Sequence, residues 1–299
     1  AIKSYGIPSI LEASIMSSYL HPFLNKAYKI NVNKSTLYMI QEIAVDDLSE
    51  HTRRKKNGIH TPPSMDLLQD WCFSVATAVA VLHRDKIIHA DIKASNVLLY
   101  QNNTVKLTDF TLSIIKDEET KMFNHNVCTS THKPPECFLK LGWDESLDIW
   151  ALGCTFYEIA YGELLFPYQG SYERLISSLD HEKKKEREKQ AKQMIKDRYV
   201  NAILDWGDRD HNLKNKYRAY YKDKIKYKSF VLAPEFYSPE MTVFNDLLTK
   251  MLVIDHRARP TIAQVLSHPF FTGRKSPQYL TVFRPANNLS KTQKARVLT

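Results

Sequence analysis

A short stretch of the sequence, residues 89–96, brings several chemically active side chains close together. It reads HADIKASN and holds the carboxylate of Asp91, the ammonium of Lys93 and the amide of Asn96. A second carboxylate, Asp109, follows 18 residues after the first. Carboxylates accept protons and hydrogen bonds, an ammonium supplies donors and a positive charge, and an amide supplies both donors and an acceptor oxygen. Acid–base chemistry and charge neutralisation are therefore within reach of this part of the chain.

This stretch resembles the catalytic loop of eukaryotic-type serine/threonine protein kinases, HRDLxxxN, with Ala90 in place of the arginine and Ile92 in place of the leucine. The resemblance implies that Asp91 accepts or orients the proton of a substrate hydroxyl and that Asn96 ligates magnesium. It also implies that Lys93 marks the serine/threonine branch of the family and neutralises charge on the phosphoryl group in transfer.

A competing motif lies just upstream, where residues 83–85 spell His-Arg-Asp literally. The fifth residue after Asp85 is Ala90, so the asparagine that completes the family pattern is missing there. A helix is also expected to end at this point. We therefore assign the catalytic role to Asp91 and expect Asp85 to be a surface residue.

The stretch LTDFT, residues 107–111, occupies the place of the family's D-F-G element. The resemblance implies that Asp109 holds magnesium that bridges the phosphates of ATP. The family glycine is Thr111 here, which removes the freedom to adopt a positive φ angle. We expect this exchange to restrict the flip between active and inactive arrangements without abolishing activity, because the chemistry needs the carboxylate more than the glycine.

Further family matches concern residues with supporting roles. The stretch THKPPE at residues 131–136 resembles the A-P-E element that closes the activation segment, and Arg259 matches the arginine before the last helix. We therefore expect a buried ion pair between Glu136 and Arg259. Asp148 matches the aspartate of the central helix that holds the backbone of the catalytic loop, and Thr129 is expected to shape the pocket beside the phosphate acceptor.

The first residues of the chain match the end of the family's V-A-I-K signature, whose lysine, here Lys3, binds the α- and β-phosphates. Glu12 is the expected ion-pair partner of Lys3. The spacing of nine residues between the two is short for the family, so the alternative that Glu12 is a surface glutamate stays open.

A strand expected at residues 36–43 should lead into the segment that contacts adenine. By resemblance, Gln41 is the gatekeeper residue, Glu42 offers a backbone carbonyl and Ala44 offers a backbone N–H. Ala1 and Leu98 are expected to enclose the adenine ring.

The pattern of apolar residues predicts an order of elements that suits a two-lobed α+β enzyme. Strands are expected at 1–5, 36–43, 97–100 and 104–108, and helices at 9–19, 64–82, 146–161, 181–196, 240–252 and 261–268. The resemblance implies a protein kinase fold with an incomplete small β lobe and a mainly helical large lobe. We divide the chain into a partial small lobe and hinge at 1–45, a large lobe at 46–273 with a basic insertion at about 170–235, and a basic tail at 274–299.

Composition and charge exclude several classes of protein. The sequence has no uninterrupted apolar run of 18 residues and no secretory signal pattern, and its four scattered cysteines indicate neither a disulfide framework nor a zinc site. An intracellular protein, cytoplasmic or nuclear and without a membrane span, is expected. Residues 181–228 hold 16 Lys and Arg against eight Asp and Glu, and residues 274–299 hold six against none. We interpret both stretches as docking surfaces for a partner; nucleic-acid binding at 214–228 remains possible but is less favoured than a solvated helix.

Two functions remain open at this stage. The first is ATP- and Mg²⁺-dependent phosphorylation of serine or threonine in protein substrates; the alternative is a pseudokinase scaffold that binds partners or nucleotide without phosphoryl transfer. The sequence begins at the third strand of the family with no Gly-rich loop before it, which we interpret as an N-terminal truncation. The long insertion after about residue 170 and the hinge ending in Asp47-Leu48 resemble the group of cyclin-dependent and mitogen-activated kinases.

Overall fold

The computed structural model describes residues 2–6, 10–33, 36–53, 55–56, 59–60, 62–117, 123, 127–138, 142–165, 239–253 and 256–275. The basic insertion, all but two residues of the basic tail and the helix expected at 181–196 lie outside the described residues, as does Ala1.

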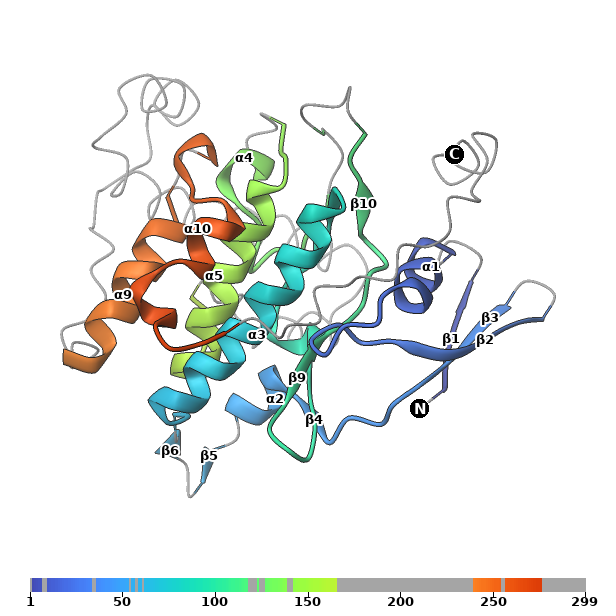
Figure 1. Ribbon diagram of the computed structural model, residues 1–299, viewed down its shortest axis with the longest axis horizontal. Coiled ribbons are helices and arrows are strands. Elements are labelled where there is room, and N and C mark those ends of the chain that lie inside the picture. The colour runs from blue at the N-terminus through green and yellow to red at the C-terminus, as the bar shows by residue number, and fades with distance from the viewer. Residues whose placement is uncertain are drawn as a thin grey trace, which may run out of the picture.

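A small antiparallel sheet forms one end of the molecule and lies on the right of Figure 1. Its strands are β1 (Ile2–Gly6), β2 (Ala27–Asn33) and β3 (Thr36–Gln41), in the order β1-β3-β2, and Lys3 is paired with Met39. The side chains of β3 alternate between half-buried and buried, as expected for a strand with one face on the core. Helix α1 (Ile10–Ser18) packs against β2 and buries Glu12, Ala13, Ile15 and Met16.

Helices make up most of the other lobe, in which α3 (Met65–Arg84) and α5 (Ser146–Tyr161) occupy the centre (Figure 1). Ser64 caps α3 by accepting a hydrogen bond from the N–H of Leu67, directly after Pro62 and Pro63. The other α-helices among the described residues are α2 (Leu48–Arg53), α4 (Pro135–Phe138), α9 (Pro239–Met251) and α10 (Ile262–Leu266). The helix expected at 261–268 is shorter than predicted, because a 3₁₀ turn at Pro269–Phe271 follows and Pro269 has no N–H to continue an α-helix.

Short strands connect the lobes and carry the loops of the site. A hairpin of β8 (Val97–Leu99) and β9 (Val105–Leu107) pairs with β4 (Asp46–Asp47), while β7 (Ile87–Ile88) pairs with β10 (Ile114–Ile115). A separate pair, β5 (Lys55–Lys56) and β6 (Ile59–His60), follows α2. The described residues thus confirm the expected α+β arrangement, with a small sheet beside a mainly helical lobe.

The apolar core is continuous from α1 and the small sheet through α3 and α5 to α9 and α10. A second, smaller cluster consists of Ile88, Ala90, Val127, Trp143 and Leu147. Helix α3 is long and apolar enough to span a membrane by composition alone, but 67% of its apolar window is buried inside the protein. It is therefore accounted for as a core helix.

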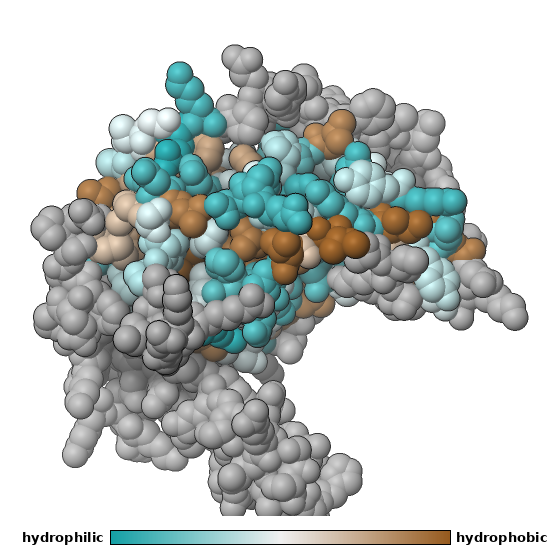
Figure 2. All heavy atoms as spheres, turned by 90° about the horizontal axis from the view of Figure 1, so that it is seen from below, coloured by the Kyte–Doolittle hydropathy of each residue, from teal (hydrophilic) through white to brown (hydrophobic). Residues whose placement is uncertain are grey.

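The outer face seen from below mixes hydrophilic and hydrophobic side chains (Figure 2). Among the described residues, the most exposed large apolar side chain is that of Ile43, at 77%, and Val45 beside it is also exposed. Both lie in the connection between β3 and β4, where strand β3 ends two residues earlier than the sequence predicts.

Candidate active site

Asp148 of α5 holds the backbone that leads into the HADIKASN loop. Its carboxylate is fully buried and accepts hydrogen bonds from the N–H of His89 at 2.8 Å and of Ala90 at 2.9 Å. His83, near the end of α3, lies with Nε2 2.9 Å from the same carboxylate. Ala90 has a φ of 63°, a conformation that non-glycine residues rarely adopt. The hydrogen bonds from the N–H groups of His89 and Ala90 to Asp148 stabilise the strained turn that precedes Asp91.

The carboxylate of Asp91 is buried, yet it is surrounded by hydrogen-bond donors. Its Oδ1 accepts from the N–H of Thr129 at 2.9 Å and from the Thr129 hydroxyl at 2.6 Å, and its Oδ2 accepts from Lys93 Nζ at 2.8 Å. Burial acts to raise the pKa of Asp91, but the hydrogen bonds from Lys93 and Thr129 outweigh it and hold the pKa below its usual value. Asp91 is therefore ionised at neutral pH.

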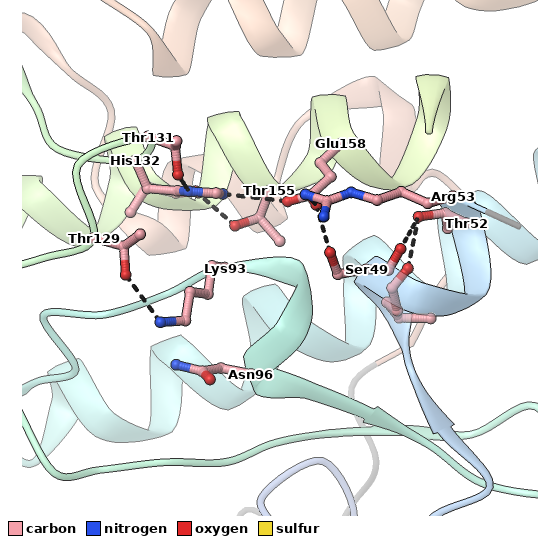
Figure 3. A network of polar contacts seen from close by, with 12 residues as sticks. Ser49, Thr52, Arg53, Lys93, Asn96, Thr129, Thr131, His132, Thr155 and Glu158 are labelled. Carbon is pink, nitrogen blue, oxygen red and sulfur yellow. Dashed lines mark hydrogen bonds and ion pairs between the residues drawn. The ribbon is translucent and has the colours of Figure 1, made fainter. Parts of the chain in front are cut away.

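Lys93 and Asn96 complete this part of the site. Asn96 is the last residue of the 3₁₀ turn Ala94–Asn96, and Lys93 directly precedes that turn. Lys93 Nζ also donates to the Thr129 hydroxyl at 2.9 Å, as Figure 3 shows. Asn96 Nδ2 donates to the backbone oxygen of Asp91 at 2.8 Å, so its amide oxygen is the atom suited to ligate a cation. The N–H of Thr108 donates to the backbone oxygen of Asn96 at 2.9 Å, which joins the loop to the end of the β8–β9 hairpin.

Asp109 follows that hairpin and has a φ of 63°. Its Oδ1 accepts a hydrogen bond from the Thr111 hydroxyl at 2.6 Å. The neighbouring Phe110 is fully buried, with its ring centroid 5.3 Å from that of His89. Packing of Phe110 against His89 anchors this segment next to the catalytic loop, and Asp109 itself is half-buried.

Asn96 and Asp109 supply an amide oxygen and a carboxylate, which are oxygen ligands of the kind that Mg²⁺ prefers. Among the described residues, no group of three or more His, Cys, Asp and Glu side chains is arranged to hold a metal ion. Mg²⁺ is usually held by one or two protein ligands together with substrate phosphates and water. The residues present therefore fit a metal ion that arrives with a nucleotide.

Glu12 of α1 is fully buried, so the alternative of a surface glutamate is wrong. Its Oε2 lies 3.3 Å from the Thr111 hydroxyl oxygen, which brings α1 to the Asp109 segment. The backbone of Lys3 lies in the sheet opposite Met39, and its side chain is not among those described. The pairing of Lys3 with Glu12 stays a prediction.

Residues expected around adenine lie where β3 ends and β8 runs beside the connection. Gln41 is buried and accepts from Asn25 Nδ2 at 2.9 Å. Glu42 is exposed and forms an ion pair with Lys106 at 2.5 Å. Ala44 and Leu98 are both partly buried. The expected place of Ala1 lies outside the described residues.

Glu136 and Arg259, which are 123 positions apart in the sequence, come together in the structure. Arg259 donates from Nη1 and Nη2 to the two oxygens of Glu136, each at 2.7 Å, and from Nε to the backbone oxygen of Val253 at 2.8 Å. Their side chains are 0% and 2% exposed. The guanidinium also stacks over Trp150, with 5.0 Å to the ring centroid. This arrangement fixes the end of the activation segment against α5.

The structure adds a polar cluster that the sequence did not predict, centred on Glu158 of α5 (Figure 3). Glu158 accepts from Ser49 at 2.8 Å and from Arg53 at 2.7 Å, and His132 Nε2 lies 3.5 Å from it. Burial acts to raise the pKa of Glu158, but His132, Ser49 and Arg53 together hold it below the usual value. The partners of Glu158 come from α2 and the activation segment, and no local spacing in the sequence links them to α5.

Asp85, the aspartate of the literal His-Arg-Asp tripeptide, is exposed and does not join this site. It accepts a hydrogen bond from the Tyr19 hydroxyl at 2.8 Å and forms an ion pair with its neighbour Arg84. Burial of Tyr19, together with the Asp85 carboxylate, raises the pKa of the Tyr19 hydroxyl. Asp85 therefore links α1 to the end of α3 and has the surface position expected from the sequence.

A two-lobed fold with this catalytic loop and Asp-Phe segment defines a protein kinase. The family model for the protein kinase domain matches residues 5–271, and the chain belongs to the protein kinase family. Among curated proteins, the chain is 30% identical to cyclin-dependent kinase 15 of Mus musculus over 165 residues, which cover 54% of this chain and 37% of that protein. It is 34% identical to Aurora kinase of Saccharomyces cerevisiae over 152 residues, which cover 50% of this chain and 40% of that protein.

The aligned part spans less than half the length of either relative. The predicted resemblance to the serine/threonine protein kinase catalytic domain, and to the group that includes cyclin-dependent kinases, is confirmed. The predicted protein kinase fold is confirmed as well.

Proposed function

We propose that this protein is an active protein kinase that transfers the γ-phosphoryl group of ATP to serine or threonine hydroxyls of protein substrates, with Asp91 as the catalytic carboxylate. The observation that carries the proposal is the arrangement of Asp91, Lys93 and Thr129, in which both oxygens of an ionised carboxylate are oriented by donors. A pseudokinase would not need this arrangement. Membership of the protein kinase family gives it the chemical context.

Asp91 acts mainly by orienting the substrate hydroxyl. A general base is most effective when its pKa lies near the working pH. The hydrogen bonds from Lys93 and Thr129 hold the pKa of Asp91 below its usual value, so the carboxylate is ionised and is a weak base. Asp91 therefore holds the hydroxyl in line and takes its proton late, when the oxygen has begun to bond to phosphorus.

Lys93 has a second part in the proposal. Its ammonium lies between Asp91 and Thr129 and can neutralise negative charge on the phosphoryl group in transfer. Asn96 and Asp109 would hold Mg²⁺, which when bound supplies charge neutralisation between the phosphates. Glu12 and Lys3 are proposed to position the α- and β-phosphates. Asp148, Glu136 and Arg259 are proposed to have structural roles only.

The remaining parts of the proposal concern the cell and the partners. The protein is proposed to be intracellular, cytoplasmic or nuclear, which is supported by four cysteines that are all free. The basic stretches at 181–228 and 274–299 are proposed docking surfaces for a protein partner, supported by their charge. Nucleic acid stays the less favoured occupant of residues 214–228.

The test compares two aspartates that the sequence makes rival candidates. Asp91→Asn should lower phosphoryl transfer from radiolabelled ATP to a generic basic protein by about a thousandfold or more, because it removes the charge of the catalytic carboxylate. Asp85→Asn should leave transfer within about twofold, since Asp85 bonds Tyr19 away from the site. Full activity of Asp91→Asn with loss in Asp85→Asn would reverse the assignment. Nucleotide binding by the wild-type protein without any transfer would favour the pseudokinase.

A further inference from the structure

We propose that the hydroxyl of Thr111 is a positioning group for the metal site: it fixes the Asp109 carboxylate and links it to Glu12 of helix α1. This inference rests on the proposed function, because it assigns Asp109 to the metal ion that accompanies the nucleotide. It gives a role to the residue that replaces the family glycine.

The geometry places one hydroxyl between two carboxylates. Thr111 Oγ1 lies 2.6 Å from Asp109 Oδ1 and 3.3 Å from Glu12 Oε2. The shorter distance is that of a charge-assisted O–H···O⁻ bond, which is about twice as strong as a bond between neutral groups. The backbone N–H of Thr111 also points at Asp109 Oδ1, at 3.4 Å. A glycine at this position would keep the N–H and lose the hydroxyl.

Thr111 occupies this position without backbone strain. The positive φ angles of the described non-glycine residues fall at Lys86, Ala90, Asn103, Asp109 and Cys128, and Thr111 is not among them. Left-handed conformation in this segment is therefore carried by Asp109, two residues before the threonine. The expected loss of conformational freedom at Thr111 costs nothing in this arrangement, and the side chain is free to take a polar role.

A hydroxyl has a single proton, so it can donate to only one of the two carboxylates at a time. At 2.6 Å, the shorter of the two distances, the Thr111 hydroxyl donates its hydrogen bond to Asp109. When Asp109 Oδ1 binds a cation, the Thr111 hydroxyl can rotate and donate to Glu12 instead. Glu12 lies in α1 and is fully buried. Thr111 thereby couples occupancy of the metal site to the position of α1, whose glutamate is the proposed partner of Lys3.

The experiment measures nucleotide affinity with and without the metal ion, so it does not depend on turnover. The probe is the non-hydrolysable analogue AMP-PNP, titrated by calorimetry into the full-length protein in the presence of Mg²⁺ and again in the presence of a chelator. Thr111→Val removes the hydroxyl and keeps the shape of the side chain, while Thr111→Ser keeps the hydroxyl. Thr249→Val is the matched control, because the hydroxyl of Thr249 donates to the backbone oxygen of Asn245 within its own helix, α9.

We expect Thr111→Val to weaken the Mg²⁺-dependent affinity by about tenfold, equivalent to about 1.4 kcal/mol, and to leave the affinity in chelator unchanged. Thr111→Ser and Thr249→Val should stay within about twofold of the wild type. A variant that had merely lost fold stability would bind more weakly under both conditions, so the two titrations separate positioning from folding.

A second measurement tests the link to α1 with a double-mutant cycle on the same affinity. The effects of Thr111→Val and Glu12→Gln should be non-additive by at least threefold if the hydroxyl couples the two carboxylates. Equal Mg²⁺-dependent affinity of Thr111→Val and the wild type overturns the inference and leaves the proposed function standing. Absence of Mg²⁺-dependent binding in the wild type itself overturns both.

Discussion

Thr129 donates two hydrogen bonds to the same oxygen of Asp91, one from its backbone N–H at 2.9 Å and one from its hydroxyl at 2.6 Å. The two residues are 38 positions apart, in the catalytic loop and in the activation segment. The activation segment is therefore tied directly to the proposed catalytic carboxylate. A shift of the activation segment would therefore change the hydrogen bonding of Asp91.

Removing the hydroxyl of Thr129 should change both the rate and its pH dependence. Hydrogen bonds to an ionised carboxylate lower its pKa, so Thr129→Val should move the pKa of Asp91 upward and shift the acid limb of the pH–rate profile to higher pH. We expect a fall of about tenfold in kcat at neutral pH, because the carboxylate loses one orienting donor. Thr129→Ser, which keeps the hydroxyl, should retain the profile. An unshifted acid limb in Thr129→Val would show that the hydroxyl does not tune Asp91.

Breaking the ion pair between Glu136 and Arg259 should destabilise the fold strongly. Removal of one partner leaves an uncompensated buried charge, which costs about 3–5 kcal/mol. Arg259→Met should therefore lower the free energy of unfolding in urea by about this amount, and a double variant with Glu136→Gln should recover part of the loss. Lys250→Ala is the control, because its pair with Asp246 is about half exposed and such pairs contribute at most about 1 kcal/mol. Equal losses from the two pairs would contradict the assignment of a structural role to Arg259.

The cluster around Glu158 should make stability sensitive to acid. The pKa of Glu158 is held below the usual 4.5 in the folded state. Glu158 therefore contributes stability that is present above about pH 4.5 and is lost as the pH falls through the folded-state pKa. Glu158→Gln should cost about 1–3 kcal/mol at neutral pH and flatten the decline of stability between about pH 5 and about pH 3. The measurement is the urea midpoint as a function of pH. Glu50→Gln, on the exposed side of α2, should keep the wild-type slope.

Phosphorylation of the activation segment should not be required for activity. In family members that depend on it, the arginine before the catalytic aspartate holds the phosphate through a bidentate charged pair. Here that residue is Ala90, and its side chain is fully buried in the apolar cluster with Val127, Trp143 and Leu147. The Ala90 side chain offers a phosphate no cationic partner. Its apolar packing against Val127 orders the activation segment instead.

The check is the rate of the full-length protein before and after phosphatase treatment, with occupancy followed by mass spectrometry. The residues to monitor are Thr120, Thr129, Ser130 and Thr131. We expect rates within about threefold of each other. A loss of about tenfold on dephosphorylation, equivalent to about 1.4 kcal/mol, would show that another cationic group holds a phosphate and would contradict the prediction.

The sequence alone was sufficient for the elements with a strong local pattern. The apolar spacing of α3 and α5 and the turn chemistry between β8 and β9 predicted these elements to within two residues, because each depends on neighbours along the chain. The choice of Asp91 over Asp85 also came from local spacing to Asn96. Strand β2 was missed although residues 28–33 alternate between apolar and polar side chains. Asn31 and Asn33 are of a type that strands disfavour, and the strand is established by its pairing with β3.

Tertiary structure decided most contacts between distant segments, apart from those of Glu136 with Arg259 and of Asp148 with the catalytic loop, which the resemblance had predicted. It brought Thr129 onto Asp91, buried Glu12 beside Thr111, and gathered Ser49, Arg53 and His132 around Glu158. Hydrogen bonds of this kind depend on distances of a few tenths of an ångström between side chains from separate elements. The sequence shows which hydrogen-bonding side chains the chain contains. Which of them pair is decided only when the elements pack together, because burial removes the alternative of bonding to water.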